Sequence, residues 1–144
     1  MKPVTREEIV SNEDYEAERP ALRHRVMGLK NDRRVHLGDH LTFLFENRDT
    51  IRYQVQEMLR IEGRSSDEDV EHELRTYNEL LGGERELGCT LLIEIEDPDE
   101  REQKLGAWID LPRHLALELE GGSLSRAVFD ERQVGDGRLS SVQY

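Results

Sequence analysis

The sequence predicts an α+β fold formed by a single domain that spans residues 1–144. Three observations predict this class: helical periodicity dominates residues 20–81, two short strand-like runs flank residue 39, and runs after residue 89 are short, β-rich and separated by glycine turns. A chain of 144 residues is long enough to bury one core. We therefore expect a mostly antiparallel sheet with N-terminal helices and a central antiparallel helix pair.

The first helix is expected from about Pro20 to Lys30, because proline suits the first turn of a helix and disrupts its interior. Residues 5–18 hold two further capping patterns and therefore two other possible helix starts. The buried stripe of the expected helix recurs at i, i+4 and i+7 and consists of Leu22, Val26 and Leu29.

A β-hairpin is expected next. Arg34–Leu37 alternates as a strand does, and Gly38-Asp39 is a turn signal. Leu41–Phe45 is nearly continuously apolar, which is typical of a strand that is covered on both faces.

Two helices follow and are expected to pack as an antiparallel pair. The first spans Arg48–Ile61, and its apolar stripe is expected to face the sheet. The second is expected to start at the capping pattern Ser65-x-x-Glu68 and to end at Leu81, before Gly82-Gly83. One ridge of the first helix contains Ile51, Val55, Met58 and Glu62, with Leu59 beside it, and the opposite side contains Arg52, Gln56 and Arg60.

The remainder reads as short strands around one helix. Asp97-Pro98 opens a helix that is expected to reach Gly106, and Gly121-Gly122 is a hairpin turn signal. The expected strands are Cys89–Ile95, a half-buried Leu115–Leu119, Leu124–Phe129 and a last strand from Leu139 to Tyr144, with a turn at residues 135–137.

Composition and charge disfavour several classes of function. The net charge is −12: residues 1–64 carry 12 basic and 12 acidic side chains, whereas residues 65–144 carry 8 basic and 20 acidic ones. Such an acidic half repels phosphate backbones, so we expect no nucleic-acid partner. The single cysteine, Cys89, excludes an internal disulfide and a multi-cysteine zinc site. Without a signal peptide or a membrane span, we expect a soluble cytoplasmic protein.

Three histidines are weak metal-site candidates. His36 and His40 could point the same way from an extended chain, and Asp69-x-x-His72 places a carboxylate and an imidazole one helical turn apart. The spacing lacks a closed ligand set, so the alternative is that these histidines are solvated.

Polar residues around the hairpin and helix pair form the candidate binding centre. If the polar flank of the helix pair faces the hairpin, the following residues could gather there: Glu46, Arg48, Gln54, Glu57, Tyr77 and Asn78. Abundant carboxylates make chance pairs common, and no nucleophile or phosphate-loop motif is present. An equally weighted alternative is that these side chains exist for folding, as caps and as partners of loop backbone.

The stretch 40–62, HLTFLFENRDTIRYQVQEMLRIE, resembles a bacterial family known as a domain of unknown function. The likeness extends over nearly the whole chain, to Arg34, Gly38, Tyr77-Asn78-Glu79, Leu92–Ile95, Arg126–Phe129 and Ser141–Tyr144. Members are encoded beside rubrerythrin-like and iron–sulfur proteins, so the resemblance implies a role near iron or peroxide chemistry. It also implies a tail beyond Tyr144.

The leading hypothesis is a cytoplasmic accessory protein that binds a redox partner, namely a rubrerythrin-like or iron–sulfur protein. The acidic half could complement a basic partner. One alternative is a metal-dependent or small-ligand enzyme that uses Glu46, Glu57 and His40 or His72. Another is a structural homodimer that forms by edge pairing of the late strands.

Overall fold

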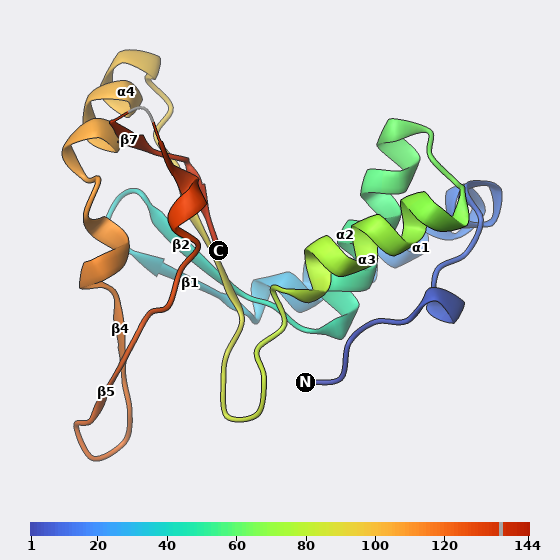
Figure 1. The fold of residues 1–144 in the computed structure, drawn as a ribbon, viewed down its shortest axis with the longest axis horizontal. Helices are drawn as coiled ribbons and strands as arrows, with labels where there is room; N and C mark the ends of the chain where they lie inside the picture. The colour runs from blue at the N-terminus through green and yellow to red at the C-terminus, as the bar shows by residue number, and fades with distance from the viewer. Residues whose placement is uncertain (136) are drawn as a thin grey trace. The chain divides into compact units, whose positions relative to one another are not determined.

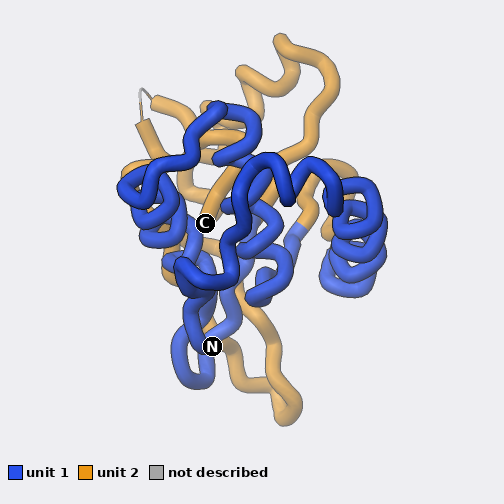
Figure 2. The backbone as a smooth tube through the Cα atoms, turned by 90° about the vertical axis from the view of Figure 1, so that its right-hand side faces the viewer, with its two compact units in different colours: residues 1–35, 43–90 blue, residues 36–42, 91–144 orange. Residues whose placement is uncertain are grey.

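The computed structural model describes residues 1–135 and 137–144, and it confirms the α+β class, with helices and antiparallel strand pairs. Its internal contacts divide the chain into two compact units (Figures 1 and 2). Unit 1 comprises residues 1–35 and 43–90, and unit 2 comprises residues 36–42 and 91–144. That the chain folds as a single domain stays a prediction.

Unit 1 is helical. Its helices are α1 (Asn12–Asn31), α2 (Arg48–Glu62) and α3 (Asp67–Asn78), and both α1 and α3 pack against α2 (Figure 1). An N-terminal segment with a short 3₁₀ turn at Arg6–Glu8 completes the core. Burial of each large aliphatic side chain contributes about 1.5–3 kcal/mol. The core cluster contains Val4, Ile9, Ile51, Val55, Leu59, Val70 and Leu74.

Helix α1 corrects the first prediction, because it begins at Asn12 and Pro20 lies inside it. Ser11 caps the helix by accepting a hydrogen bond from the backbone N–H of Asp14. An interior proline costs about 3 kcal/mol, and burial on both sides of Pro20 offsets that cost. Tyr15 and Val26 are each 1% exposed, whereas Leu22 and Leu29 of the expected stripe are only half-buried.

Helix α2 has the predicted bounds to within one residue, but its stripe faces other partners than expected. Ile51, Val55 and Leu59 pack on α3 and the N-terminal segment. The sheet-facing prediction is therefore wrong. Gln56 was expected on the open side and is buried, because its amide bonds both backbone groups of Val10 (Oε1 to N 2.8 Å, Nε2 to O 3.3 Å).

Helix α3 starts and ends one turn or less from its predicted bounds. Its N-cap is Ser66 rather than Ser65, and the Ser66 hydroxyl accepts from the backbone N–H of Asp69 at 3.1 Å. The helix ends at Asn78 rather than at Leu81.

A four-stranded sheet has the order β1-β2-β3-β8, with β3 and β8 antiparallel. The predicted neighbours β1 and β2 are joined by a turn in which Gly38 has a φ of 64°, a conformation that favours glycine. Strand β2 is fully buried on one face and half-buried on the other, and β1 is largely exposed at the sheet edge. The strands are β1 (Arg34–Leu37), β2 (Leu41–Phe45), β3 (Cys89–Ile93) and β8 (Val142–Gln143).

Unit 2 also contains helix α4 (Pro98–Ala107), which Asp97 caps as the sequence predicts. Leu105 of α4 and Leu139 of β7 are both fully buried, and α4 contacts β7. The predicted last strand is wrong as a continuous element, because the chain forms β7 and then β8 with a break between them. The short strands are β6 (Val134–Gly135) and β7 (Arg138–Leu139), and a 3₁₀ turn spans Leu111–His114. Of the predicted turn at residues 135–137, residue 136 lies outside the described residues.

Strands β4 (Ala116–Glu118) and β5 (Leu124–Arg126) pair only with each other. Every residue of both strands is exposed, so the expectation of a half-buried strand is wrong. Across the part of the chain that the structure describes, no helix has the length and apolar character needed to cross a membrane.

Candidate functional site

Two of the predicted site residues hold the N-terminal segment in place. Arg48, in the first turn of α2, donates to both carboxylate oxygens of Glu8 (2.6 and 2.7 Å) and to the carbonyls of Lys2 and Pro3. Asn78, the last residue of α3, bonds Val4 as a strand would: its Oδ1 accepts from the Val4 N–H at 2.8 Å and its Nδ2 donates to the Val4 carbonyl at 2.9 Å. Both side chains therefore support the core that Val4 helps to form.

Glu46 is a buried carboxylate whose hydrogen bonds come from two threonines. Its Oε2 accepts from the hydroxyl of Thr50 at 2.5 Å, and its Oε1 accepts from the hydroxyl of Thr90 at 2.7 Å. Arg33 donates to the carbonyls of Phe45 and Glu46 at 2.6 and 3.3 Å. Glu46 thus ties the start of α2 to the strand that contains Thr90.

Glu57 joins α2 to α1. The guanidinium of Arg19 binds its carboxylate in a bidentate manner (2.6 and 3.0 Å), and the Tyr15 hydroxyl donates to it at 2.8 Å. The bond from Arg19, and after it the bond from Tyr15, hold the pKa of Glu57 below its usual value. Burial and the neighbouring Glu57 raise the pKa of Tyr15, so the hydroxyl stays protonated as a donor.

Lys30 lies within electrostatic range of both carboxylates. Its Nζ lies 5.5 Å from the ring centre of Tyr53, a cation–π arrangement. Burial lowers the pKa of Lys30, and the charges of Glu46 and Glu57 oppose that shift. We call this set, Tyr15, Arg19, Lys30, Glu46, Tyr53 and Glu57, the α1–α2 seam.

Cys89, beside the seam, is a packed thiol. Burial, and to a smaller extent the charge of Glu46, raise the pKa of Cys89 to about 11. A thiol with this pKa is largely protonated at neutral pH and is a poor nucleophile.

The remaining predicted binding residues do not join a single centre. Gln54 is half-buried on α2, and among the described residues no hydrogen bond to its side chain is found. Tyr77 packs against the core cluster of unit 1. The predicted set therefore separates into an N-terminal anchor (Arg48, Asn78), the seam (Glu46, Glu57) and two side chains that belong to neither. That these residues bind a ligand stays a prediction.

The predicted metal candidates also fall into separate settings. His72 is exposed on α3 in unit 1, whereas His36 and His40 belong to unit 2. Within residues 1–135 and 137–144, no group of three or more His, Cys, Asp or Glu side chains is placed to hold a metal ion. Metal binding thus gains no support from the geometry.

His36 and His40 instead bond residues of the sheet. The Nδ1 of His36 lies 3.0 Å from the Thr42 hydroxyl, and that hydroxyl donates to Oε2 of Glu94 at 2.5 Å. The Nδ1 of His40 lies 3.3 Å from the carbonyl of Glu94, and its Nε2 lies 3.8 Å from the Glu100 carboxylate. Sequence reasoning singled out both histidines but missed Thr42 and Glu94.

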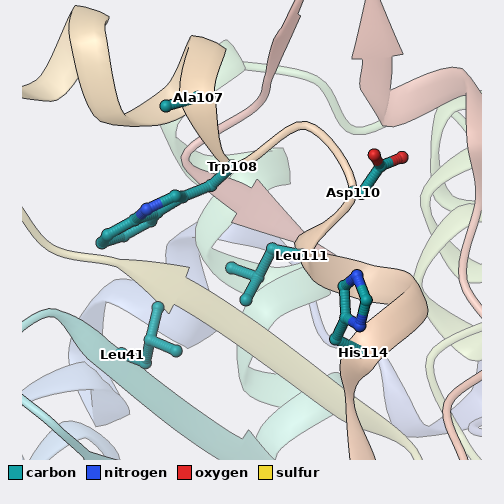
Figure 3. A pocket seen from close by; sticks show the side chains of 6 residues that line it. All are labelled: Leu41, Ala107, Trp108, Asp110, Leu111 and His114. Atoms are coloured by element: carbon teal, nitrogen blue, oxygen red, sulfur yellow. The ribbon is translucent and has the colours of Figure 1, made fainter.

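A shallow pocket of about 500 Å³ lies in unit 2 beside the lone tryptophan. In Figure 3 the indole of Trp108 extends over Leu41 and Leu111, while Asp110 and His114 lie to one side of this apolar group. The ring centre of His40 lies 6.0 Å from the ring centre of Trp108, and the Lys104 ammonium lies 5.3 Å from the same Trp108 ring centre.

Comparison with known proteins identifies the family but no activity. A model of the family described as "Protein of unknown function (DUF3501)" matches residues 3–144. The chain belongs to the DUF3501 family. It is also similar to a crystal structure described as a novel protein of unknown function from Burkholderia pseudomallei K96243, with 31% sequence identity and a TM-score of 0.92. The match covers 99% of this chain and 75% of that one. A comparison with curated proteins finds no match.

Proposed function

We propose that this DUF3501 protein is a cytoplasmic accessory protein that binds a redox partner, a rubrerythrin-like or iron–sulfur protein. The class of the partner comes from the family resemblance of the sequence. The mode of binding comes from one observation in the structure, the uncovered β4–β5 hairpin of unit 2.

The hairpin has the features of a docking arm. Leu117 and Leu124 are 41% and 61% exposed. The register pairs Leu117 with Ser125 and Glu118 with Leu124, so the two leucines project from opposite faces. Figure 1 shows the hairpin reaching away from the α4 region of the same unit. Neither face of this ladder is covered by the described residues of its unit.

Such an arm is suited to a protein partner. An isolated two-stranded ladder is marginally stable in water, and its outer edges offer unpaired backbone groups to which a strand of another chain can add. The chain's net charge of −12 further favours a partner with a basic surface.

The α1–α2 seam is a weaker candidate for the surface that binds the partner. The carboxylate of Glu57 is occupied by Arg19 and Tyr15, and that of Glu46 by two threonine hydroxyls. A catalytic role for Glu46, Glu57 and His40 or His72 stays a prediction.

Affinity capture from native cells tests the proposal. The tagged chain should retain a rubrerythrin-like or iron–sulfur protein, identified by mass spectrometry and by its bound iron. The double variant Leu117→Asp/Leu124→Asp should lose it. Leu87→Asp is the matched control, because Leu87 is 66% exposed but lies in unit 1.

Two outcomes would overturn the proposal. One is retention of the same redox protein by the double variant. The other is repeated recovery of the chain with copies of itself alone, which would favour the structural homodimer.

A further inference from the structure

Three side chains form a hydrogen-bonded row across neighbouring strands of unit 2. His36 belongs to β1, Thr42 to β2, and Glu94 directly follows β3. The row runs from the His36 Nδ1 to the Thr42 hydroxyl (3.0 Å) and from that hydroxyl to the Glu94 carboxylate (2.5 Å). Thr42 is 2% exposed, whereas His36 and Glu94 are exposed. We call this row the His36 relay.

Counting donors fixes the tautomer of His36. A threonine hydroxyl has a single hydrogen, and in this row the Thr42 hydroxyl donates it to the Glu94 carboxylate. The contact between Thr42 and His36 therefore needs its hydrogen from Nδ1 of the imidazole. In the neutral ring the Nε2 of His36 then carries the free lone pair, on a side chain that is open to solvent.

This is how a basic imidazole is prepared in many active sites. A carboxylate behind the imidazole holds the ring in one tautomer and orientation, and it stabilises the imidazolium that forms when Nε2 accepts a proton. In the His36 relay the hydroxyl of Thr42 transmits that effect from Glu94. A side chain that only stapled the two strands would need the bond between His36 and Thr42, but it would not need a carboxylate that orients the hydroxyl.

We propose that His36 is a catalytic nucleophile at the edge of the sheet, with Thr42 and Glu94 as its positioning residues. Its substrates would be small molecules with an activated acyl group, approaching the exposed His36 side chain from solvent. This activity is independent of partner binding through the hairpin.

The step balances as an acyl transfer. The Nε2 lone pair attacks the acyl carbon and the phenolate or alkoxide departs with its bonding electrons, which leaves an acyl-imidazolium. The proton stays on Nδ1, where it is hydrogen-bonded to the Thr42 hydroxyl. Glu94 therefore stabilises the positive ring without taking a proton. Water then adds to the acyl carbon, a proton is released to solvent, the carboxylic acid leaves, and neutral His36 is restored.

The first test is a direct measurement of the tautomer. Isotope-edited NMR of the histidine ring nitrogens at a pH where the rings are neutral should show His36 protonated at Nδ1. Thr42→Ser should retain this state, and Thr42→Val should lose it. A wild-type His36 protonated at Nε2 would overturn the proposal.

The second test is reactivity toward p-nitrophenyl acetate. His36→Gln should lower the rate of p-nitrophenolate release by roughly tenfold or more, because it removes the attacking lone pair, and Thr42→Val should lower the rate nearly as far. Thr42→Ser should retain most of the rate, and a loss of rate in a folded Thr42→Val is the result that a purely structural role in the sheet does not predict.

His114→Gln is the matched control, because His114 is exposed in the same unit but has no place in the relay. Circular dichroism and Trp108 fluorescence will show that each variant is folded. Folded His36→Gln with an unchanged rate, or equal losses in His36→Gln and His114→Gln, would refute the proposed nucleophile.

Discussion

Unit 1 and unit 2 place their polar side chains in different ways. In unit 1, each side chain that bonds Glu46, Glu57 or Val4 comes from the same unit, and these bonds join helices to one another, to a strand or to the N-terminal segment. In unit 2, the His36 relay begins at a carboxylate, passes through a buried hydroxyl and ends at an exposed imidazole. The comparison teaches that the polar groups of unit 1 are satisfied by one another and thereby specify packing, whereas the reactivity proposed for His36 depends on a row that reaches solvent.

The largest expected effect concerns apolar burial in the two units. Leu59→Ala should destabilise the protein by about 2–4 kcal/mol, because Leu59 is 2% exposed in the unit 1 core. Leu124→Ala in the hairpin should change stability by about 0.5 kcal/mol or less. Urea unfolding followed by circular dichroism measures both. Equal losses of stability in Leu59→Ala and Leu124→Ala would mean that the hairpin is packed in solution. The contrast between a buried unit 1 core and an uncovered hairpin would then be wrong.

An intermediate effect is expected for the two carboxylates. Glu57→Gln should cost about 1–2 kcal/mol near neutral pH, because it replaces a charge-assisted pair that is partly exposed. Glu94→Gln should cost about 0.5 kcal/mol or less, because that side chain is exposed and an amide oxygen can still accept from Thr42.

The pH dependence of the Glu57 effect has a defined sign. The pKa of Glu57 is lower in the folded protein than in the unfolded chain. Its stabilisation is therefore fully present above the unfolded pKa of about 4.3 and is lost as the pH falls through the folded pKa. The stability difference between wild type and Glu57→Gln should shrink in acid. A difference that stays constant or grows would contradict the assigned role of Arg19.

The smallest effect is one in which the two units should agree. Ser66→Ala in unit 1 and Asp97→Ala in unit 2 each remove a helix N-cap and should cost about 1 kcal/mol. Ser65→Ala should cost nearly nothing, because its neighbour Ser66 is the cap. Chemical unfolding followed by circular dichroism and by Trp108 fluorescence would compare them. A larger loss for Ser65→Ala than for Ser66→Ala would reverse the assignment.

Local patterns predicted those elements whose signals are themselves local. Helix α2 carries its own cap and apolar stripe, and β1 and β2 flank a glycine turn. The sequence therefore predicts the helix and the two strands correctly. The start of α1 was missed because the penalty at Pro20 is local, whereas the contacts of Tyr15 and Arg19 with Glu57 that offset it join distant parts of the chain.

The candidate site shows the same limit. The hairpin turn brings His36 within 3.0 Å of the Thr42 hydroxyl, so the sequence separation of these two residues across the turn could have revealed half of the relay. The proximity of Glu94 could not be predicted from a local turn. Glu94 follows β3, which lies beside β2 in the sheet but is separated from it in sequence by a long connection. Alternation also failed for Leu117, since a period of two shows which residues share a face but not whether another layer covers it.

The N-terminal segment has a consequence for how the protein is shortened. Val4 and Ile9 belong to the core cluster, and side chains of Arg48 and Asn78 bond the backbone of residues 2–4. A truncated chain that begins at Asn12, the first residue of α1, would uncover the apolar faces of α2 and α3. Such a fragment is expected to aggregate, so the first eleven residues belong in any version of the protein made for crystallography.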